Sequence, residues 1–155
     1  MKRNSKQISI LTKGFFSRPS HLVAPSLIGC FLIKRISKDS HLAGVIVETE
    51  AYSQEESSCH GFSGETERNK TLFGEPGNLY IYLSYGINNC VNIVTGRSNW
   101  ANGVLLRSIA IKGENERIAS GPGLLAKRFG LNRNFDNLPL LPSNDFWLTE
   151  GEVSD

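Results

Sequence analysis

Apolar and polar residues alternate over several short stretches of the chain, and this alternation predicts a series of β-strands. Two of the stretches, 30–36 and 43–52, are joined by a polar turn, which is typical of a β-hairpin. Three more, at 79–83, 90–95 and 103–111, are rich in β-branched and aromatic residues and predict three further strands.

Two segments outside these strands have helical patterns. Residues 20–28 predict a short helix, although Pro25 disfavours its interior. Residues 121–131 predict a second helix, because Pro122 suits the first helical position and Gly130 suits the end. Consecutive strands with helices outside them indicate an α+β domain, with a curved, mostly antiparallel sheet flanked by short helices.

The remaining segments lack periodicity. Residues 1–13 are polar and are expected to be a loosely ordered N-terminus, and residues after the second helix are expected to be irregular. Residues 53–78 predict a long loop, and a long loop in a small domain is usually functional. With 155 residues, the chain is long enough for one ordinary core, and we expect a single domain over 14–155 that acts as a monomer.

Charged residues are distributed unevenly along the chain. The net charge is +2, which alone argues against a strongly basic nucleic-acid coat protein. Residues 1–38 carry +8, residues 39–76 carry −6, residues 77–133 carry +5 and residues 134–155 carry −5. This segregation is compatible with a positive face that attracts a polyanion, and equally with an ordinary solvated surface.

The cysteines and the apolar runs limit the class of protein. Cys30, Cys59 and Cys90 are odd in number and widely spaced, so we expect neither a disulfide framework nor a metal site. A reducing cytoplasm is the natural compartment for such a chain. No run approaches the roughly 20 apolar residues of a membrane helix, and no signal peptide is recognisable, so no membrane partner is expected.

The strand over 43–52 carries the first candidate chemistry. Alternation is expected to place Ile46, Glu48, Glu50 and Tyr52 on one face. Glutamate is depleted in strands, so two carboxylates beside an aromatic ring are unusual. They fit either a solvent-facing surface or a carboxylate that acts as general base at the wall of a cleft.

Aromatic and basic residues supply further candidates. Tyr80 and Tyr82 share one face of their strand, and Tyr85 follows in a turn where it could stack on bases or enter a duplex. Arg107 interrupts an apolar strand, so it lies on the exposed face or pairs with a carboxylate, for which Glu50 is the candidate.

Two glycine-containing motifs could approach phosphate. The loop ERNKTLFGEPGN (67–78) holds Arg68 and Lys70, which we expect to contact the DNA backbone if the partner is DNA. The GPG at 121–123 opens a helix and offers backbone N–H groups to an anion. Glycine loops are common, and each motif alone indicates no more than a turn.

Taken together, the segments resemble a known family. The segments that carry the resemblance occur in the same order along the chain as in the family. They are FFSRPSHLVAPSLIG, GVIVETEAY, CHGFSGETERNKTLFGEPGNLYIYLSYGINNCVNIV, GVLLRS and SGPGLLAKRFGL. They are similar to the alkyladenine (3-methyladenine, methylpurine) DNA glycosylases over residues 14–150. The resemblance implies a fold like the C-terminal domain of formyltransferases. It also implies a DNA-repair enzyme, without cofactor or metal, that flips alkylated purines from double-stranded DNA.

The resemblance assigns the hydrolytic step to two side chains. Glu50 is the implied general base, which activates water to attack the sugar carbon and stabilises the positive charge that develops there. Arg107 is implied to hold Glu50 and the water, whereas Glu48 is expected to be structural. The pocket matches supply no lysine nucleophile, so a monofunctional hydrolase without strand cleavage is expected.

The same resemblance assigns the base pocket. The flipped base is implied to lie between Tyr52 and His60 on one side and Tyr82 on the other, where electron-rich rings stack on an alkylated purine. Asn92 is implied to screen the purine edge and to disfavour normal guanine. Tyr85 is implied to fill the gap that the flipped nucleotide leaves in the duplex.

The chain also departs from the family pattern. Ser63 stands where the family usually has Arg, Glu67 where it has Pro, and Leu124 where Lys is common, so phosphate contacts are reduced. The chain ends before the family's last stretch, which indicates a C-terminally shortened member. A weakened or catalytically inactive DNA-binding relative is therefore an alternative. An RNA-binding domain of the formyltransferase type is a third reading, against which the carboxylate in an aromatic pocket argues.

Overall fold

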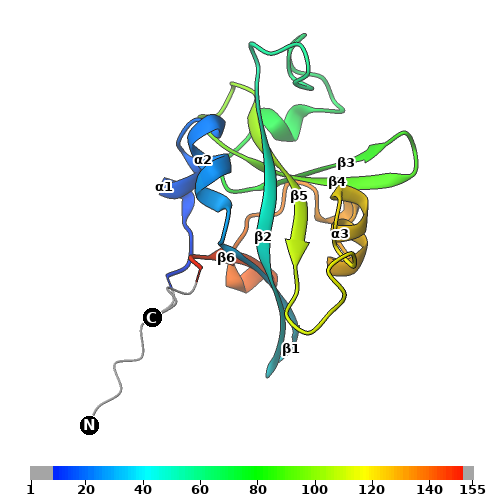
Figure 1. The fold of residues 1–155 in the computed structure, drawn as a ribbon. Coiled ribbons are helices and arrows are strands. Elements are labelled where there is room, and N and C mark those ends of the chain that lie inside the picture. The colour runs from blue at the N-terminus through cyan, green and yellow to red at the C-terminus, as the bar shows by residue number, and fades with distance from the viewer. Residues whose placement is uncertain (1–8, 152–155) are drawn as a thin grey trace.

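The alternating stretches pair into one antiparallel sheet in a computed structural model, which describes residues 9–151 (Figure 1). Neighbouring strands follow the order β3-β4-β5-β2-β1-β6. The strands are β1 (Phe31–Ser37), β2 (Ser40–Ser53), β3 (Leu79–Ser84), β4 (Asn88–Val94), β5 (Asn102–Ala110) and β6 (Phe146–Thr149). The five predicted strands and the α+β class are confirmed.

The sixth strand contradicts the expectation that the C-terminal part is irregular. All four residues of β6 are buried, and the strand pairs antiparallel with β1, for example Trp147 with Ile33. Ile10 forms a bridge to Thr149 on the other side of β6, and Leu11 is buried in the core. Of the segment expected to be loosely ordered, residues 1–8 lie outside the described residues.

Short helices flank the sheet. They are α1 (Lys13–Phe16), α2 (Ser20–Leu27) and α3 (Pro122–Phe129), with 3-10 turns η1 (Lys70–Phe73), η2 (Arg133–Phe135) and η3 (Pro142–Asn144). In Figure 1, α2 packs beside β2 and β5, whereas α3 packs beside β4 and β5. Both predicted helices are confirmed, and α3 begins at Pro122 and ends before the left-handed Gly130, as expected.

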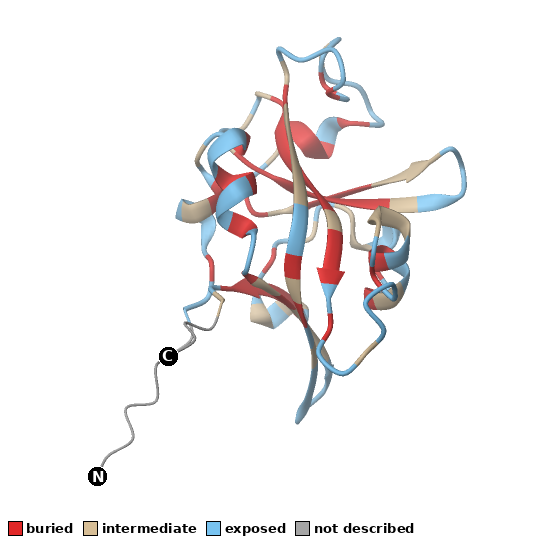
Figure 2. Ribbon diagram, viewed as in Figure 1, coloured by how far each residue is buried: buried red, intermediate tan, exposed pale blue. Residues whose placement is uncertain are grey.

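All six strands contribute to the main core together with α2 and α3. Burial therefore follows the strands, while the hairpin tips and the long loop are exposed (Figure 2). A smaller apolar cluster lies under the loop that follows β2. It contains Cys59, Leu72, Phe73, Tyr80, Val94 and Ala101, against which Tyr52 and Tyr82 pack. This second cluster therefore supports the rings of Tyr52 and Tyr82.

Two β-bulges change which side chains share a face of β2 and β5. The register pairs Ile46 with Ile109, Glu48 with Ser108, and Thr49 with Leu106. Val47 and Arg107 are therefore the extra residues of their strands. A bulge reverses the alternation of a strand, so Ile46 is buried in the core while Glu48 is exposed. The expectation that Ile46 shares the face of the two glutamates is wrong for this reason.

The described residues also bear on membranes and metals. No helix within residues 9–151 is long and apolar enough to cross a membrane. Over the same range, no group of three or more histidines, cysteines and acidic residues is placed to hold a metal ion. Cys30, Cys59 and Cys90 are free thiols in buried positions.

Candidate active site

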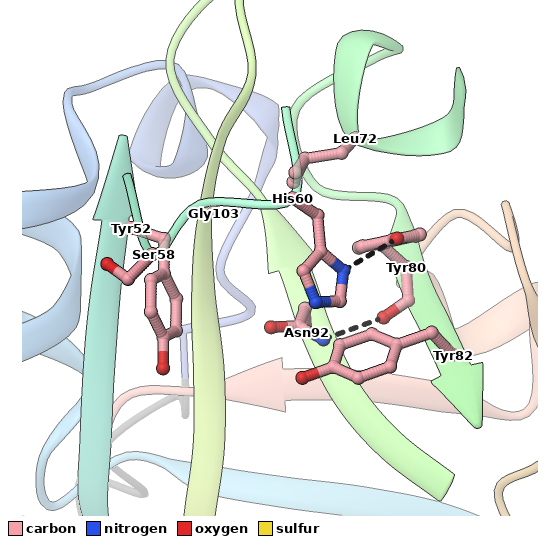
Figure 3. A pocket seen from close by; sticks show the side chains of 8 residues that line it. All are labelled: Tyr52, Ser58, His60, Leu72, Tyr80, Tyr82, Asn92 and Gly103. Carbon is pink, nitrogen blue, oxygen red and sulfur yellow. Dashed lines mark hydrogen bonds between the residues drawn. The ribbon is translucent and has the colours of Figure 1, made fainter. Parts of the chain in front are cut away.

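A small hollow, open to solvent on one side, lies between the upper parts of β2 and β3 (Figure 3). Its walls come from four strands, η1 and the loop after β2. The lining residues are Tyr52, Ser58, His60, Leu72, Tyr80, Tyr82, Asn92 and Gly103. The structure thus brings together all four residues that the sequence assigned to a base pocket.

Three aromatic rings form one wall of the pocket. The His60 ring lies against Tyr82, with centroids 4.2 Å apart, and its Nδ1 atom is 3.1 Å from the Tyr80 hydroxyl oxygen. Tyr52 stands across the pocket on β2 (Figure 3). His60 is therefore on the Tyr82 side, and the expected grouping of His60 with Tyr52 is wrong. Tyr80 was missed as a pocket residue, although its alternation with Tyr82 could have identified it.

Asn92 lies between the two aromatic walls on β4. Its amide nitrogen donates to the backbone carbonyls of Tyr80, at 3.3 Å, and of Cys90, at 3.4 Å. Because carbonyl oxygens only accept, these two bonds fix the orientation of the amide. The Asn92 oxygen is consequently turned toward the Tyr52 side of the pocket (Figure 3).

The pocket rings are neutral near pH 7. Partial burial, with a smaller effect of the nearby Arg68 charge, lowers the pKa of His60, so the imidazole is uncharged at neutral pH. Burial raises the pKa of Tyr80 to about 12. Burial and the Glu50 carboxylate likewise raise the pKa of Tyr52 to about 12. The pocket therefore offers neutral, electron-rich faces to a ligand.

A buried asparagine holds the loop that carries His60. The Asn69 amide donates to the carbonyls of His60, at 2.8 Å, and Gly64, at 3.1 Å. Its oxygen accepts the Thr66 backbone N–H at 2.6 Å. Sequence reasoning gave Asn69 no role, because its partners are known only once the loop is folded.

Two glycines allow the backbone to come close to the pocket. A Cβ atom on Gly61 would lie 2.2 Å from the Cβ of Ala101, so only glycine lets the loop beside His60 approach the residue that precedes β5. A Cβ on Gly103 would lie 2.9 Å from a methyl group of Leu72 and would fill the pocket floor.

A charged group lies beside the pocket on the same face of the sheet. Glu50 pairs with Leu105 on β5, and Leu105 pairs with Asn92 on β4, so Glu50 and Asn92 lie in one row. The Arg107 Nη1 atom donates to Oε2 of Glu50 at 2.7 Å, which confirms the predicted pairing. The Nε atom of Arg107 also donates to Oε1 of Glu48 at 3.2 Å. Glu50 remains 43% exposed and accessible to water.

The residues assigned to DNA contact lie at the surface. Tyr85 occupies the three-residue tip between β3 and β4, is 97% exposed and has a φ of 50°. A left-handed conformation is uncommon for a bulky residue and is often found at functional sites. Arg68 is exposed, whereas the amine of Lys70 forms an ion pair with Glu67 at 3.1 Å.

Comparison with known proteins assigns the chain to a family. The family described as Methylpurine-DNA glycosylase (MPG) matches residues 14–155. A protein of Trichodesmium erythraeum is 33% identical, over 94% of this chain and 80% of its own length. A protein of Carboxydothermus hydrogenoformans is 35% identical, over 92% of this chain and 81% of its own length. A protein of a Wolbachia of Brugia malayi is 36% identical, over 94% of this chain and 83% of its own length. All three carry the provisional name 3-methyladenine DNA glycosylase.

The aromatic pocket and the arginine-held carboxylate lie side by side on a small antiparallel sheet. The chain belongs to the methylpurine-DNA glycosylase family.

Proposed function

We propose that the chain is a monofunctional DNA glycosylase that removes alkylated purines, such as 3-methyladenine, from double-stranded DNA and so initiates base excision repair. The observation that carries this proposal is the Arg107-bound carboxylate of Glu50 in one row with Asn92 beside the aromatic pocket. DNA is the substrate, so we place the enzyme with the chromosome in a bacterial cytoplasm. It acts as a monomer, because one chain supplies every residue of the site.

Recognition requires the damaged nucleotide to leave the base stack. The flipped purine enters between Tyr52 on one side and His60 with Tyr82 on the other. An alkylated purine that carries a positive charge is attracted to these neutral rings by a cation–π interaction. The oxygen of Asn92 contacts the purine edge, and the side chain disfavours guanine.

Hydrolysis then needs one activated water. The water oxygen forms a bond to the sugar C1′ atom, and its proton passes to the oxygen of Glu50 that Arg107 does not bind. The electrons of the N-glycosidic bond leave with the base, so a cationic alkylated purine departs as a neutral molecule. The Glu50 charge stabilises the positive charge that develops on the sugar, as in glycoside hydrolysis.

The exposed tip of the β3–β4 hairpin supports the flipped state. Tyr85 enters the gap in the duplex, because an aromatic wedge replaces the stacking that the flipped base has lost. Arg68 contacts the DNA backbone, and Lys70 does so when phosphate competes with Glu67. These contacts predict DNA affinity that falls with increasing salt.

The test is release of free base from duplex DNA that carries radiolabelled methyl groups. We expect released 3-methyladenine and a DNA strand that stays intact until alkali cleaves it at the abasic site. An unmethylated duplex of the same sequence serves as the control. Salt-dependent binding without any base release would instead indicate the non-catalytic relative.

A further inference from the structure

Arg107 contacts two carboxylates to which the family resemblance gives different roles, Glu50 as general base and Glu48 as a structural residue. Its Nη1 atom binds Oε2 of Glu50 at 2.7 Å, and its Nε atom binds Oε1 of Glu48 at 3.2 Å. The guanidinium is a planar fork that can hold both oxygens of one carboxylate at once. Among residues 9–151 it instead contacts one oxygen of each glutamate.

The two β-bulges make this sharing possible. Arg107 is the extra residue of β5, and it lies in the register between the pairs formed by Glu48 and Thr49. An extra residue re-aims its side chain relative to the neighbouring strand. Arg107 can therefore reach Glu48 and Glu50 together, although these residues are two positions apart on β2.

Glu48 is itself oriented from its other side. The Ser108 hydroxyl lies 3.5 Å from Oε2 of Glu48 and accepts the backbone N–H of Gly121 at 3.1 Å. Since the Ser108 oxygen is used as an acceptor, its proton is free to point to Glu48. The start of α3 thus supports Glu48, and Glu48 in turn supports Arg107.

The sharing has a chemical consequence for a general base. A carboxylate clamped through both oxygens by an arginine has one lone pair of each oxygen occupied, so neither oxygen is left uncontacted and both are poorer proton acceptors. A carboxylate held through one oxygen is oriented, yet keeps the other oxygen for water. The second arrangement is the one that a water-activating Glu50 requires.

We propose that Glu48 is a positioning residue, which holds the Nε atom of Arg107 and thereby keeps one oxygen of Glu50 available to the attacking water. This inference rests on the proposed glycosylase function. Glu48 acts through Arg107 and does not contact the substrate. Exposed ion pairs contribute little to stability, so variants of Glu48 and Arg107 are expected to fold.

The experiment is a double-mutant cycle on the single-turnover rate of base release at saturating protein. We expect Glu48→Gln to lower this rate about tenfold while the Kd for methylated duplex stays within about twofold. In an Arg107→Lys background, Glu48→Gln should change the rate by less than about twofold, because a lysine has no planar fork with which to clamp Glu50. Rate losses that multiply independently would overturn the proposal.

A matched control separates positioning from loss of a surface ion pair. Glu114 binds Arg128 through two hydrogen bonds of 2.7 Å, and neither residue lines the pocket. Glu114→Gln should leave the rate unchanged. If wild type releases base and Glu48→Gln is as fast as wild type, the positioning role is wrong and the proposed function stands. If wild type releases no base, the proposed function fails, and the positioning role fails with it.

Discussion

The Nη1 atom of Arg107 lies 2.7 Å from Oε2 of Glu50, and this contact holds the carboxylate beside the aromatic pocket. Arg107→Gln removes the charge that orients Glu50 and leaves it next to the like charge of Glu48. We expect a loss of about 100-fold in the single-turnover rate, equivalent to about 2.7 kcal/mol of transition-state stabilisation.

Arg128→Gln removes an arginine of the same kind from the Glu114 pair and is the control for this change. Its rate should match that of wild type. A rate for Arg107→Gln within about threefold of wild type would show that Glu50 needs no arginine, since such a change is under about 0.7 kcal/mol.

The lowered pKa of His60 predicts how stability depends on pH. As pH falls below 6.5, the ordinary histidine value, the unfolded chain binds a proton that the folded chain resists. The free energy of unfolding should therefore decrease until pH reaches the lowered pKa of folded His60. Glu55, Glu75 and Glu114 also have lowered pKa values, but they act below their ordinary value of 4.5.

Urea unfolding of wild type and His60→Gln at a series of pH values above 5 measures this dependence. The slope of stability against pH should be smaller in His60→Gln than in wild type. Parallel curves for the two proteins would show that His60 is not the titrating group.

Removal of the Asn69 amide should lower both the stability of the protein and the order of the pocket. Asn69→Ala leaves the carbonyls of His60 and Gly64 and the N–H of Thr66 without their partner. An unsatisfied buried group costs about 1–3 kcal/mol, and these three groups are only partly buried, so we expect a total destabilisation of about 2 kcal/mol. The affinity for methylated duplex should fall as well, because the His60 loop loses its anchor.

Asn132→Ala is the control for that variant, since Asn132 makes an exposed hydrogen bond to the N–H of Asn134. Its loss of stability should stay below about 1 kcal/mol, as for a helix cap. Equal destabilisation of the two variants in urea would contradict the anchoring role of Asn69.

Replacement of Tyr85 should slow base release without lowering the stability of the protein. Asparagine tolerates the left-handed conformation better than tyrosine, and the exposed ring makes no core contact. The free energy of unfolding of Tyr85→Asn should therefore lie within about 0.5 kcal/mol of the wild-type value. Without the wedge, base release from duplex DNA should slow by about tenfold or more, whereas a lesion opposite a mismatch, which flips easily, should be affected less.

Ile36→Asn changes another exposed apolar residue, at the far end of β1, and should not alter either rate. A Tyr85→Asn enzyme with wild-type rates on both duplexes would remove the wedge from the mechanism.

Much of the fold could be predicted because its elements are local. Alternation over 43–52 and 79–83 is strong, and Pro122 with Gly130 marks both ends of α3. The short strand β6 could not be predicted, because the four residues after Asp145 become a strand only by pairing with β1, which is distant in sequence.

In the candidate site too, some features follow from local sequence and others depend on contacts between segments that are distant in sequence. The pairing of Glu50 with Arg107 follows from an unusual charge in each of two strands. The bulge at Val47, however, depends on how β2 and β5 register against each other, and it moved Ile46 into the core. The placement of His60 against Tyr82 depends on a folded loop that no periodicity describes.

The central claim is that Glu50 activates the attacking water. Glu50→Gln retains the size of the side chain and a hydrogen-bond acceptor for Arg107, but an amide cannot take the proton. The most direct measurement is single-turnover release of 3-methyladenine from methylated duplex by both proteins, with Kd measured in parallel. We predict that Glu50→Gln binds DNA at least as tightly as wild type and releases base at least about 1000-fold more slowly, a difference of about 4 kcal/mol. Equal rates of release by the two proteins would contradict the assignment of Glu50 as the base.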